Sequence, residues 1–317
     1  DDGTIGGLST VGNGVDAATL TSSGTLGDVT TANAATTTLN GGTAGALDNA
    51  AGGTLNINET ALGGTGAVTS AGTTVVGDGL AGTATVASLA VTAGTTTVGT
   101  DGIVTGDTTT LAGSTVNSAG TLNTVSSNAG TLNVTAGSAG AITNTGTLTN
   151  AGTVASLVQN TNAAATTTNT GTITGAVDLD TGSVTQTGAT ASMGATDAAA
   201  GTTLAVNDGN VGAVTTAGTT NIGNDDAVAA TAASLAVTAG TTTVGTDGTV
   251  TGDTTTLAGS TVNSAGTLGT VSSNAGTLNV TDGTAGAITN TGTLTNAGTV
   301  ASLVQNTNAA ATTTNTG

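Results

Sequence analysis

The side chains able to do chemistry in this chain are carboxylates and hydroxyls. Its 317 residues include 18 Asp and Glu and no Lys, Arg, His or Cys, so the formal charge is −18. Asp101 and Asp107 occur in the phrase GTDGIVTGD, and Asp247 and Asp253 occupy the same places in a later copy. Calcium takes about six to eight oxygen ligands, often from such loops. The GGxGxDxUx pattern of calcium-binding β-rolls does not occur, so we expect these carboxylates to be solvated turn residues. Calcium is the alternative, with these four Asp as its candidate ligands, and no other cofactor is expected.

Catalysis would have to rely on these same groups. A Ser–His–Asp arrangement, a Schiff base and an arginine clamp all need residue types that the chain lacks. Two carboxylates can act as acid and base, but the chain has no aromatic side chain to wall a pocket. In a strand, the adjacent Asp225 and Asp226 would point to opposite faces. We therefore expect no enzyme and no catalytic residue.

The absent residue types also exclude several ligands. Without Lys or Arg nothing neutralises a phosphate backbone or an anionic membrane surface. No run approaches the roughly 18 apolar residues that a membrane span needs. Without His and Cys the usual zinc ligands and all disulfides are missing. We expect no nucleic-acid partner and no membrane insertion.

Threonine runs offer a different chemistry, the binding of ice. TTT occurs at Thr36–Thr38, Thr95–Thr97, Thr108–Thr110 and Thr166–Thr168. Ice-binding solenoids present outward Thr at a constant spacing on one flat face, whereas these runs are unevenly spaced along the chain. The sequence therefore favours Thr as a filler of strands and leaves ice binding as an alternative.

The elements that carry these residues are predicted to be short strands. Thr and Val suit a pleated surface, while Gly, Thr and Asn are poor helix formers. Alternation in phrases such as TLNVT puts Leu132 and Val134 on one face and polar residues on the other. Gly before many strands suits a tight corner, because Gly takes positive φ freely. We predict an all-β chain.

A long repeat organises these strands. Residues 88–171 return as 234–317, an offset of 146, with differences at four positions: Ile103, Asn123, Ala136 and Ser138 against Thr249, Gly269, Asp282 and Thr284. We therefore expect residues 26–171 and 172–317 to be two copies of one unit, and residues 1–25 to be the tail of a preceding copy. The whole is expected to form one continuous solenoid belonging to a longer array.

A shorter rhythm lies inside each unit: a small or polar residue, then Gly-Thr, then an aliphatic residue. Repeats on two scales indicate a solenoid, whose coils bury their aliphatic faces by stacking. We predict a parallel β-helix with about 18–21 residues per coil and roughly seven or eight coils per unit. At about 4.8 Å per coil a unit would be about 35 Å long. Stacked Asn and Thr ladders at corners and faces are expected to add hydrogen bonds between coils. Examples of the phrase are SAGTL at 118–122, NAGTL at 128–132, NTGTL at 144–148, NAGTV at 150–154 and NTGTI at 169–173.

These phrases, in near-exact tandem units, resemble the repetitive β-solenoid regions of large bacterial secreted proteins of the haemagglutinin-like and autotransporter-adhesin kind. The resemblance is compositional and covers the whole chain. It implies a right-handed β-helix, secretion to the cell surface, and a role in adhesion, filament or biofilm-matrix formation. It supplies no binding residues.

The function expected from these observations is structural: a repeat segment of an extracellular or cell-surface filament that extends or self-associates by stacking coils. Two alternatives come from other classes. One is an adhesin shaft or binding module for a glycan, a surface, a neighbouring filament or ice, with the diverged stretch 172–233 as the place to look for a patch. The other is a disordered spacer, which Gly-rich and Thr-rich composition also allows.

Overall fold

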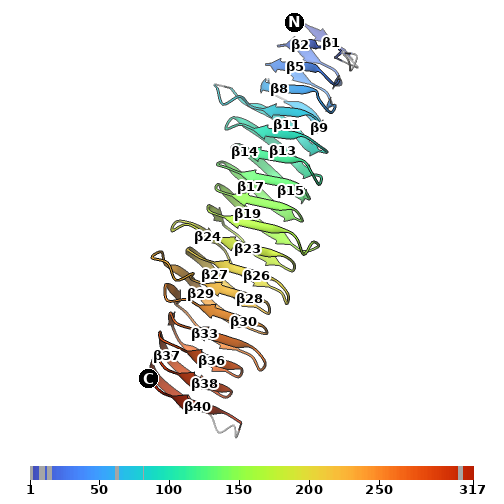
Figure 1. Cartoon of the computed structure of the whole chain (residues 1–317). Helices are drawn as coiled ribbons and strands as arrows, with labels where there is room; N and C mark the ends of the chain where they lie inside the picture. Colours follow the sequence, from blue (N-terminus) through green and yellow to red (C-terminus); the bar gives the residue numbers. More distant parts are fainter. Residues whose placement is uncertain (1–2, 7–10, 13–15, 61–63, 81, 306–309) are drawn as a thin grey trace. The chain divides into compact units, whose positions relative to one another are not determined.

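The computed structural model describes residues 3–6, 11–12, 16–60, 64–80, 82–305 and 310–317. Across these ranges the regular elements are all β-strands, and no helix occurs there that could cross a bilayer. Among the described residues the strands pair in parallel with strands of the neighbouring coils (Figure 1). The prediction of an all-β solenoid is confirmed.

The chain divides into two compact units, residues 1–155 and 156–317. In each unit the strands belong to two sheets, here called sheet A and sheet B, which the chain visits alternately as it winds. The junction of the sequence copies, between residues 171 and 172, falls inside the second unit.

In the first unit, sheet B receives one strand per coil. These strands are β2 Ala18–Ser22, β5 Ala35–Asn40, β8 Thr54–Glu59, β10 Thr73–Val76, β12 Thr95–Val98, β14 Thr115–Ser118, β16 Thr131–Val134 and β18 Thr147–Asn150. Sheet A receives the strands between them. These are β1 Thr4–Ile5, β3 Thr25–Leu26, β4 Val29–Thr31, β6 Thr43–Ala44, β7 Leu47–Asn49, β9 Thr65–Ser70, β11 Ala84–Val91, β13 Gly102–Thr110, β15 Thr121–Asn128 and β17 Ser138–Asn144.

The second unit repeats this alternation, and strand β19 Thr153–Gln159 spans the division. Its sheet B strands are β20 Thr166–Asn169, β23 Ser183–Gln186, β26 Thr203–Val206, β28 Thr219–Ile222, β30 Thr241–Val244, β33 Thr261–Ser264, β36 Thr277–Val280, β38 Thr293–Asn296 and β40 Thr312–Asn315. Its sheet A strands are β21 Thr172–Ile173, β22 Val177–Leu179, β24 Ser192–Met193, β25 Thr196–Ala198, β27 Gly209–Thr216, β29 Ala230–Val237, β31 Gly248–Val250, β32 Thr254–Thr256, β34 Thr267–Leu268, β35 Val271–Asn274, β37 Thr284–Asn290 and β39 Thr299–Gln305.

A coil contains three straight segments, two in sheet A and one in sheet B. In an early coil the three are separate strands, β3, β4 and β5. In several other coils the two sheet A segments join into one bent strand such as β11, whose alternation of buried and exposed residues is interrupted at Ala87 and Ser88. The register with β13 shifts at the same place, between Val86 and Leu89. The bend turns both halves of the strand toward one core.

Coil length varies more than the sequence suggested. Hydrogen bonds between adjacent coils join Thr38 to Asn56 across a step of 18 residues, Ser70 to Thr92 across 22, and Asn117 to Asn133 across 16. The observed lengths therefore extend beyond the predicted range on both sides. Eight sheet B strands, from β12 to β28, fall within one 146-residue period, as predicted. The differences in length lie mainly in the corners and in sheet A. In sheet B the register shifts once among the described strands, between Leu39 and Asn40.

The Gly-Thr phrase marks two different places in a coil. Thr121 opens β15 in sheet A, and Thr131 opens β16 in sheet B of the same coil. Thr147 then opens β18 in sheet B one coil later, and Thr153 opens β19 in sheet A. The spacing of the phrase is therefore irregular because it occurs both before sheet A strands and before sheet B strands.

The core is a stack of aliphatic side chains that point inward from both sheets. In sheet B, Leu55, Ile57, Leu132 and Val134 have no exposed surface, and Leu132 stands in register with Leu148 of the next coil. Burying one such side chain contributes about 1.5–3 kcal/mol. Because each coil adds its own inward residues to the stack, the core lengthens with the number of coils.

A polar Asn ladder lies at the corners, where the sequence predicts Asn ladders, and its side chains face the interior of the coils. Asn128 and Asn144 are fully buried, and the Asn128 side-chain amide donates to Oδ1 of Asn144 at 2.8 Å. Asn144 Oδ1 also accepts from the N–H of Gly146 at 3.2 Å. Asn is selected here because its side chain caps the corner two residues on and links neighbouring coils at once.

Candidate functional sites

The two candidate calcium ligands of the first copy, Asp101 and Asp107, form hydrogen bonds with different neighbouring coils. Asp101, in the turn between β12 and β13, accepts the N–H of Gly79 on its Oδ1 at 2.7 Å. Asp107, within β13, accepts the N–H of Ser126 at 3.0 Å and the Ser126 hydroxyl on its other oxygen. Gly79 lies in the preceding coil and Ser126 in the following one, so the structure does not join the two carboxylates at a shared site.

The second copy repeats this arrangement. Asp247 accepts the N–H of Asp225 at 2.9 Å and that of Asn224 at 3.4 Å. Asp253 accepts the N–H of Ser272 at 3.1 Å and the Ser272 hydroxyl. In both copies these Asp side chains satisfy backbone donors of adjacent coils, the role that a turn Asp performs.

The adjacent pair Asp225 and Asp226 lies in a loop between β28 and β29, not in a strand. Asp225 has a positive φ of 63°, and its Oδ1 accepts the N–H of Thr246 at 2.6 Å. Asp226 accepts the N–H of Val228 at 2.7 Å. The loop is thus held by its own carboxylates, which explains why acidic residues concentrate there.

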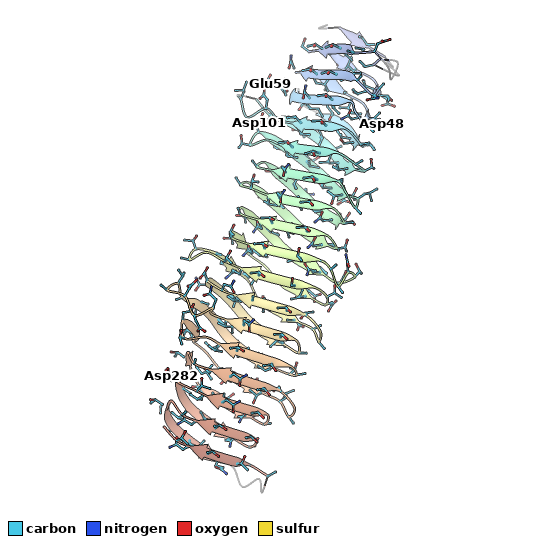
Figure 2. The ribbon with its side chains drawn as sticks, viewed as in Figure 1. Asp48, Glu59, Asp101 and Asp282 are labelled. Carbon is cyan, nitrogen blue, oxygen red and sulfur yellow. The ribbon has the colours of Figure 1, made fainter. Side chains whose placement is uncertain are left out.

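No group of three or more acidic side chains with the geometry to hold a metal occurs among the residues described. Figure 2 shows how the carboxylates are distributed in the first unit, with Asp48 on one side of the coils and Glu59 and Asp101 on the other. The four calcium candidates therefore have an observed structural role as hydrogen-bond acceptors between coils.

One acidic pair is stacked directly. Asp178 in β22 is in register with Asp197 in β25. Partial desolvation raises the pKa of the exposed Asp178 above its ordinary value, and the charges of Asp180 and Asp197 raise the pKa further. Like charges on adjacent coils disfavour the ionised form, so this pair costs stability at neutral pH.

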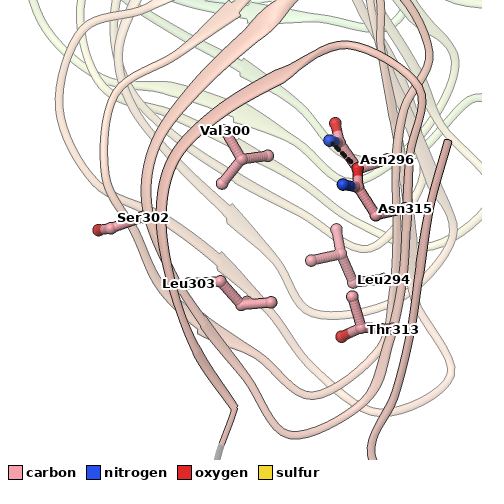
Figure 3. A pocket seen from close by; sticks show the side chains of 7 residues that line it. All are labelled: Leu294, Asn296, Val300, Ser302, Leu303, Thr313 and Asn315. Carbon is pink, nitrogen blue, oxygen red and sulfur yellow. Dashed lines mark hydrogen bonds between the residues drawn. The ribbon is translucent and has the colours of Figure 1, made fainter. Parts of the chain in front are cut away.

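A hollow of about 180 Å³ lies at the β39–β40 coil, between Leu294 and Leu303 (Figure 3). Asn296 donates to Asn315 across one side of it at 2.7 Å, and Leu303 is 41 % exposed. Leu157, the residue 146 positions earlier, is fully buried and stands in register with Val177 of the following coil. The hollow is therefore core surface that the next coil covers at the equivalent place.

Sheet B carries an outer face that the sequence did not reveal. The TTT runs at 36–38, 95–97 and 166–168 are sheet B strands with the middle Thr buried and the outer two facing out, whereas the run at 108–110 belongs to sheet A. The even spacing that the runs lack along the chain is present between coils, because strand register aligns them. The signal was the recurrence of Thr-x-Thr or Thr-x-Asn in most sheet B strands.

In comparisons with known proteins, no family model, no curated protein and no solved structure matches this chain.

Proposed function

We propose that this chain is a structural, non-catalytic extracellular protein in which stacked β-solenoid coils provide length to a bacterial surface or matrix filament. One observation carries the proposal. Successive coils keep the same strand register in sheet B. This holds although paired positions are 16 residues apart at Thr115 and Thr131 and 22 apart at Thr73 and Thr95. A coil that pairs the same way with the coils on both sides can be added any number of times without a new core.

The composition supports a location outside the cell. A chain without Lys or Arg offers trypsin no cleavage site, and one without Phe, Tyr or Trp lacks the preferred sites of chymotrypsin. The resemblance to secreted repeat proteins points the same way. Exposed strands at the end of a stack can pair with strands of another chain, which is the proposed route to self-association.

The proposal is tested by lengthening the array. One and then two further copies of residues 172–317 are appended to the full chain, and particle length is measured by negative-stain electron microscopy. With eight coils per copy, each copy should add about 40 Å at about 4.8 Å per coil. Circular dichroism of each lengthened chain should show a β signal that grows with copy number.

Two results would contradict the proposal. Particles that become wider without becoming longer would show that the copies do not stack end to end. A coil-like spectrum at every length would support the disordered spacer instead. A binding role for the stretch 172–233 would appear separately, as retention on a glycan array that is lost when this stretch is replaced by residues 26–87.

A further inference from the structure

The outer face of sheet B holds two regular columns of side chains, formed by the first and third residues of each four-residue strand segment. We call this surface the Thr face. In the first unit the first column contains Thr in every coil: Thr19, Thr36, Thr54, Thr73, Thr95, Thr115, Thr131 and Thr147. The second column is more varied but neutral: Thr21, Thr38, Asn56, Val75, Thr97, Asn117, Asn133 and Thr149.

The second unit has the same two columns, with Ser183 as the one departure from Thr in the first. That column contains Thr166, Ser183, Thr203, Thr219, Thr241, Thr261, Thr277, Thr293 and Thr312. The second column contains Thr168, Thr185, Ala205, Asn221, Thr243, Asn263, Asn279, Thr295 and Thr314.

The spacing of this array is set by the backbone. Parallel strands lie about 4.8 Å apart, and residues i and i+2 of one strand lie about 6.6 Å apart. Each unit therefore presents hydroxyl and methyl groups on a two-dimensional lattice. The lattice is stiffened from within by the buried core and from outside by amide links such as Asn133 to Asn117 at 2.8 Å.

The Thr face is also free of charge, and this is a property of the face rather than of exposed strand positions in general. Sheet A strands carry carboxylates, among them Asp48, Asp107, Asp178 and Asp197. None of the chain's 18 acidic residues occupies either column of sheet B. A ligand that complements the Thr face is thus uncharged and repeats in two dimensions at the spacing of the strands.

We propose that the Thr face binds crystalline water, that is, the surface of ice. The oxygen positions of hexagonal ice repeat at spacings close to those of the two columns, so hydroxyls on the strand lattice can take the place of lattice waters while methyl groups sit between them. A charged side chain would hold its own hydration shell out of the lattice, which accounts for the absence of carboxylates from the face.

Two other periodic occupants fit less well. Proteins hold crystalline polysaccharides largely by stacking aromatic rings on the sugars, and this chain has no aromatic residue. A second copy of the same face would have to bury hydroxyls and amides against each other, and unpaired buried polar groups are costly. Both occupants are outcomes of the experiment below.

The test uses the full 317-residue chain and measures partition into a growing ice hemisphere, thermal hysteresis and inhibition of ice recrystallisation. Three exposed Thr on consecutive coils of the first column are replaced together, Thr203→Lys, Thr219→Lys and Thr241→Lys. A matched control places three Lys on exposed positions of sheet A, Asn210→Lys, Thr215→Lys and Ala287→Lys. The two variants have the same net charge, and circular dichroism checks that both remain folded.

The native chain and the sheet A variant should both enter ice and show hysteresis. The Thr face variant should enter ice less and show lower hysteresis than the sheet A variant, because three consecutive coils of the second unit's face are disrupted while the first unit's face is unchanged. Failure of the native chain to enter ice would overturn the proposal, as would equal activity in the two variants. Binding to cellulose or chitin, or a dimer in sedimentation that only the Thr face variant loses, would assign the face to another occupant. These results do not depend on whether coils add length, so the structural proposal and this one can fail separately.

Discussion

Inside the first unit, the side-chain amide of Asn128 donates a 2.8 Å hydrogen bond to the side-chain oxygen of Asn144, 16 residues along the chain and one coil further. Both residues are fully buried. The same Asn128 amide donates to the carbonyl of Thr147 at 2.9 Å, and the Thr110 hydroxyl donates to its oxygen. Asn128 thus joins the preceding coil to the following one through the interior.

Replacing Asn128 by Ala should destabilise the chain, because the partners left behind are buried and lose their hydrogen bonds. An unsatisfied buried donor or acceptor costs about 1–3 kcal/mol. The control is Asn133→Ala, which removes a bond of the same 2.8 Å length from the half-exposed outer face and should change stability by no more than about 0.5 kcal/mol. Urea unfolding followed by circular dichroism measures the free energy of unfolding of both variants. An equal decrease in the two would show that the interior Asn ladder stabilises the chain no more than the outer one.

The interior ladder also shows where sequence reasoning stopped. The alternation that places Leu132 and Val134 on the core face was readable, because a strand has a period of two whatever surrounds it. The sequence predicts Asn ladders at corners but not the burial of Asn128 and Asn144 there, because burying an amide is unfavourable unless a hydrogen-bond partner is present. The partner lies one coil away, and only the stacked structure supplies it. The recurrence of Asn three positions before Thr in NAGT and NTGT was the available signal.

The Thr face was missed for a related reason. Distances along the chain include corners of variable length, so runs such as 36–38 and 95–97 look irregular in the sequence. Backbone pairing removes that variation, because Thr95 stands beside Thr73 on one side and Thr115 on the other although the two steps differ in length. Register is a property of stacked neighbours, and no single coil encodes it.

Corner glycines should differ in how well they tolerate a side chain. Gly94 and Gly113 both have positive φ, +65° and +83°. A Cβ on Gly94 would lie 2.2 Å from the carbonyl oxygen of Gly72 in the preceding coil, whereas a Cβ on Gly113 would meet nothing within 4 Å. Gly113→Ala should cost about 1–2 kcal/mol for the left-handed backbone alone. Gly94→Ala should cost clearly more, because the coils must also move apart. Urea midpoints of the two variants compare these costs, and equal midpoints would contradict the close approach.

The ionised Asp178 side chain should destabilise the fold at neutral pH, and this destabilisation should disappear in acid. Its folded-state pKa is raised by partial desolvation and by the charges of Asp180 and Asp197, so the folded state binds a proton more readily than the unfolded state. The unfavourable contribution is fully present above the raised folded pKa, and it disappears as the pH falls below the ordinary value of 3.8. Asp178→Asn should therefore be more stable than the native chain at pH 7, and this advantage should vanish near pH 3.

The control for this comparison is Asp282→Asn, which removes the same charge from an exposed turn before β37. Urea midpoints at pH 7 and pH 3 give the pH dependence of each variant. An equal gain from both substitutions would mean that net charge alone is responsible. A gain from Asp178→Asn that persists at pH 3 would mean that the carboxylate is not the cause.

Self-association should increase with ionic strength, because every ionisable side chain in the chain is negative. With 18 carboxylates and no Lys, Arg or His, neighbouring chains repel each other at any distance within the Debye length. That length is about 30 Å at 0.01 M salt and about 8 Å at 0.15 M, so repulsion between chains should weaken strongly over this range, and divalent cations should weaken it further. Static light scattering at a fixed protein concentration should rise with NaCl and rise at lower concentrations with CaCl₂. MgCl₂ is the control for calcium binding at the Asp101 and Asp247 turns. If scattering follows charge screening, CaCl₂ and MgCl₂ should raise it alike. A fall in scattering with either salt would contradict the idea that charge repulsion limits association.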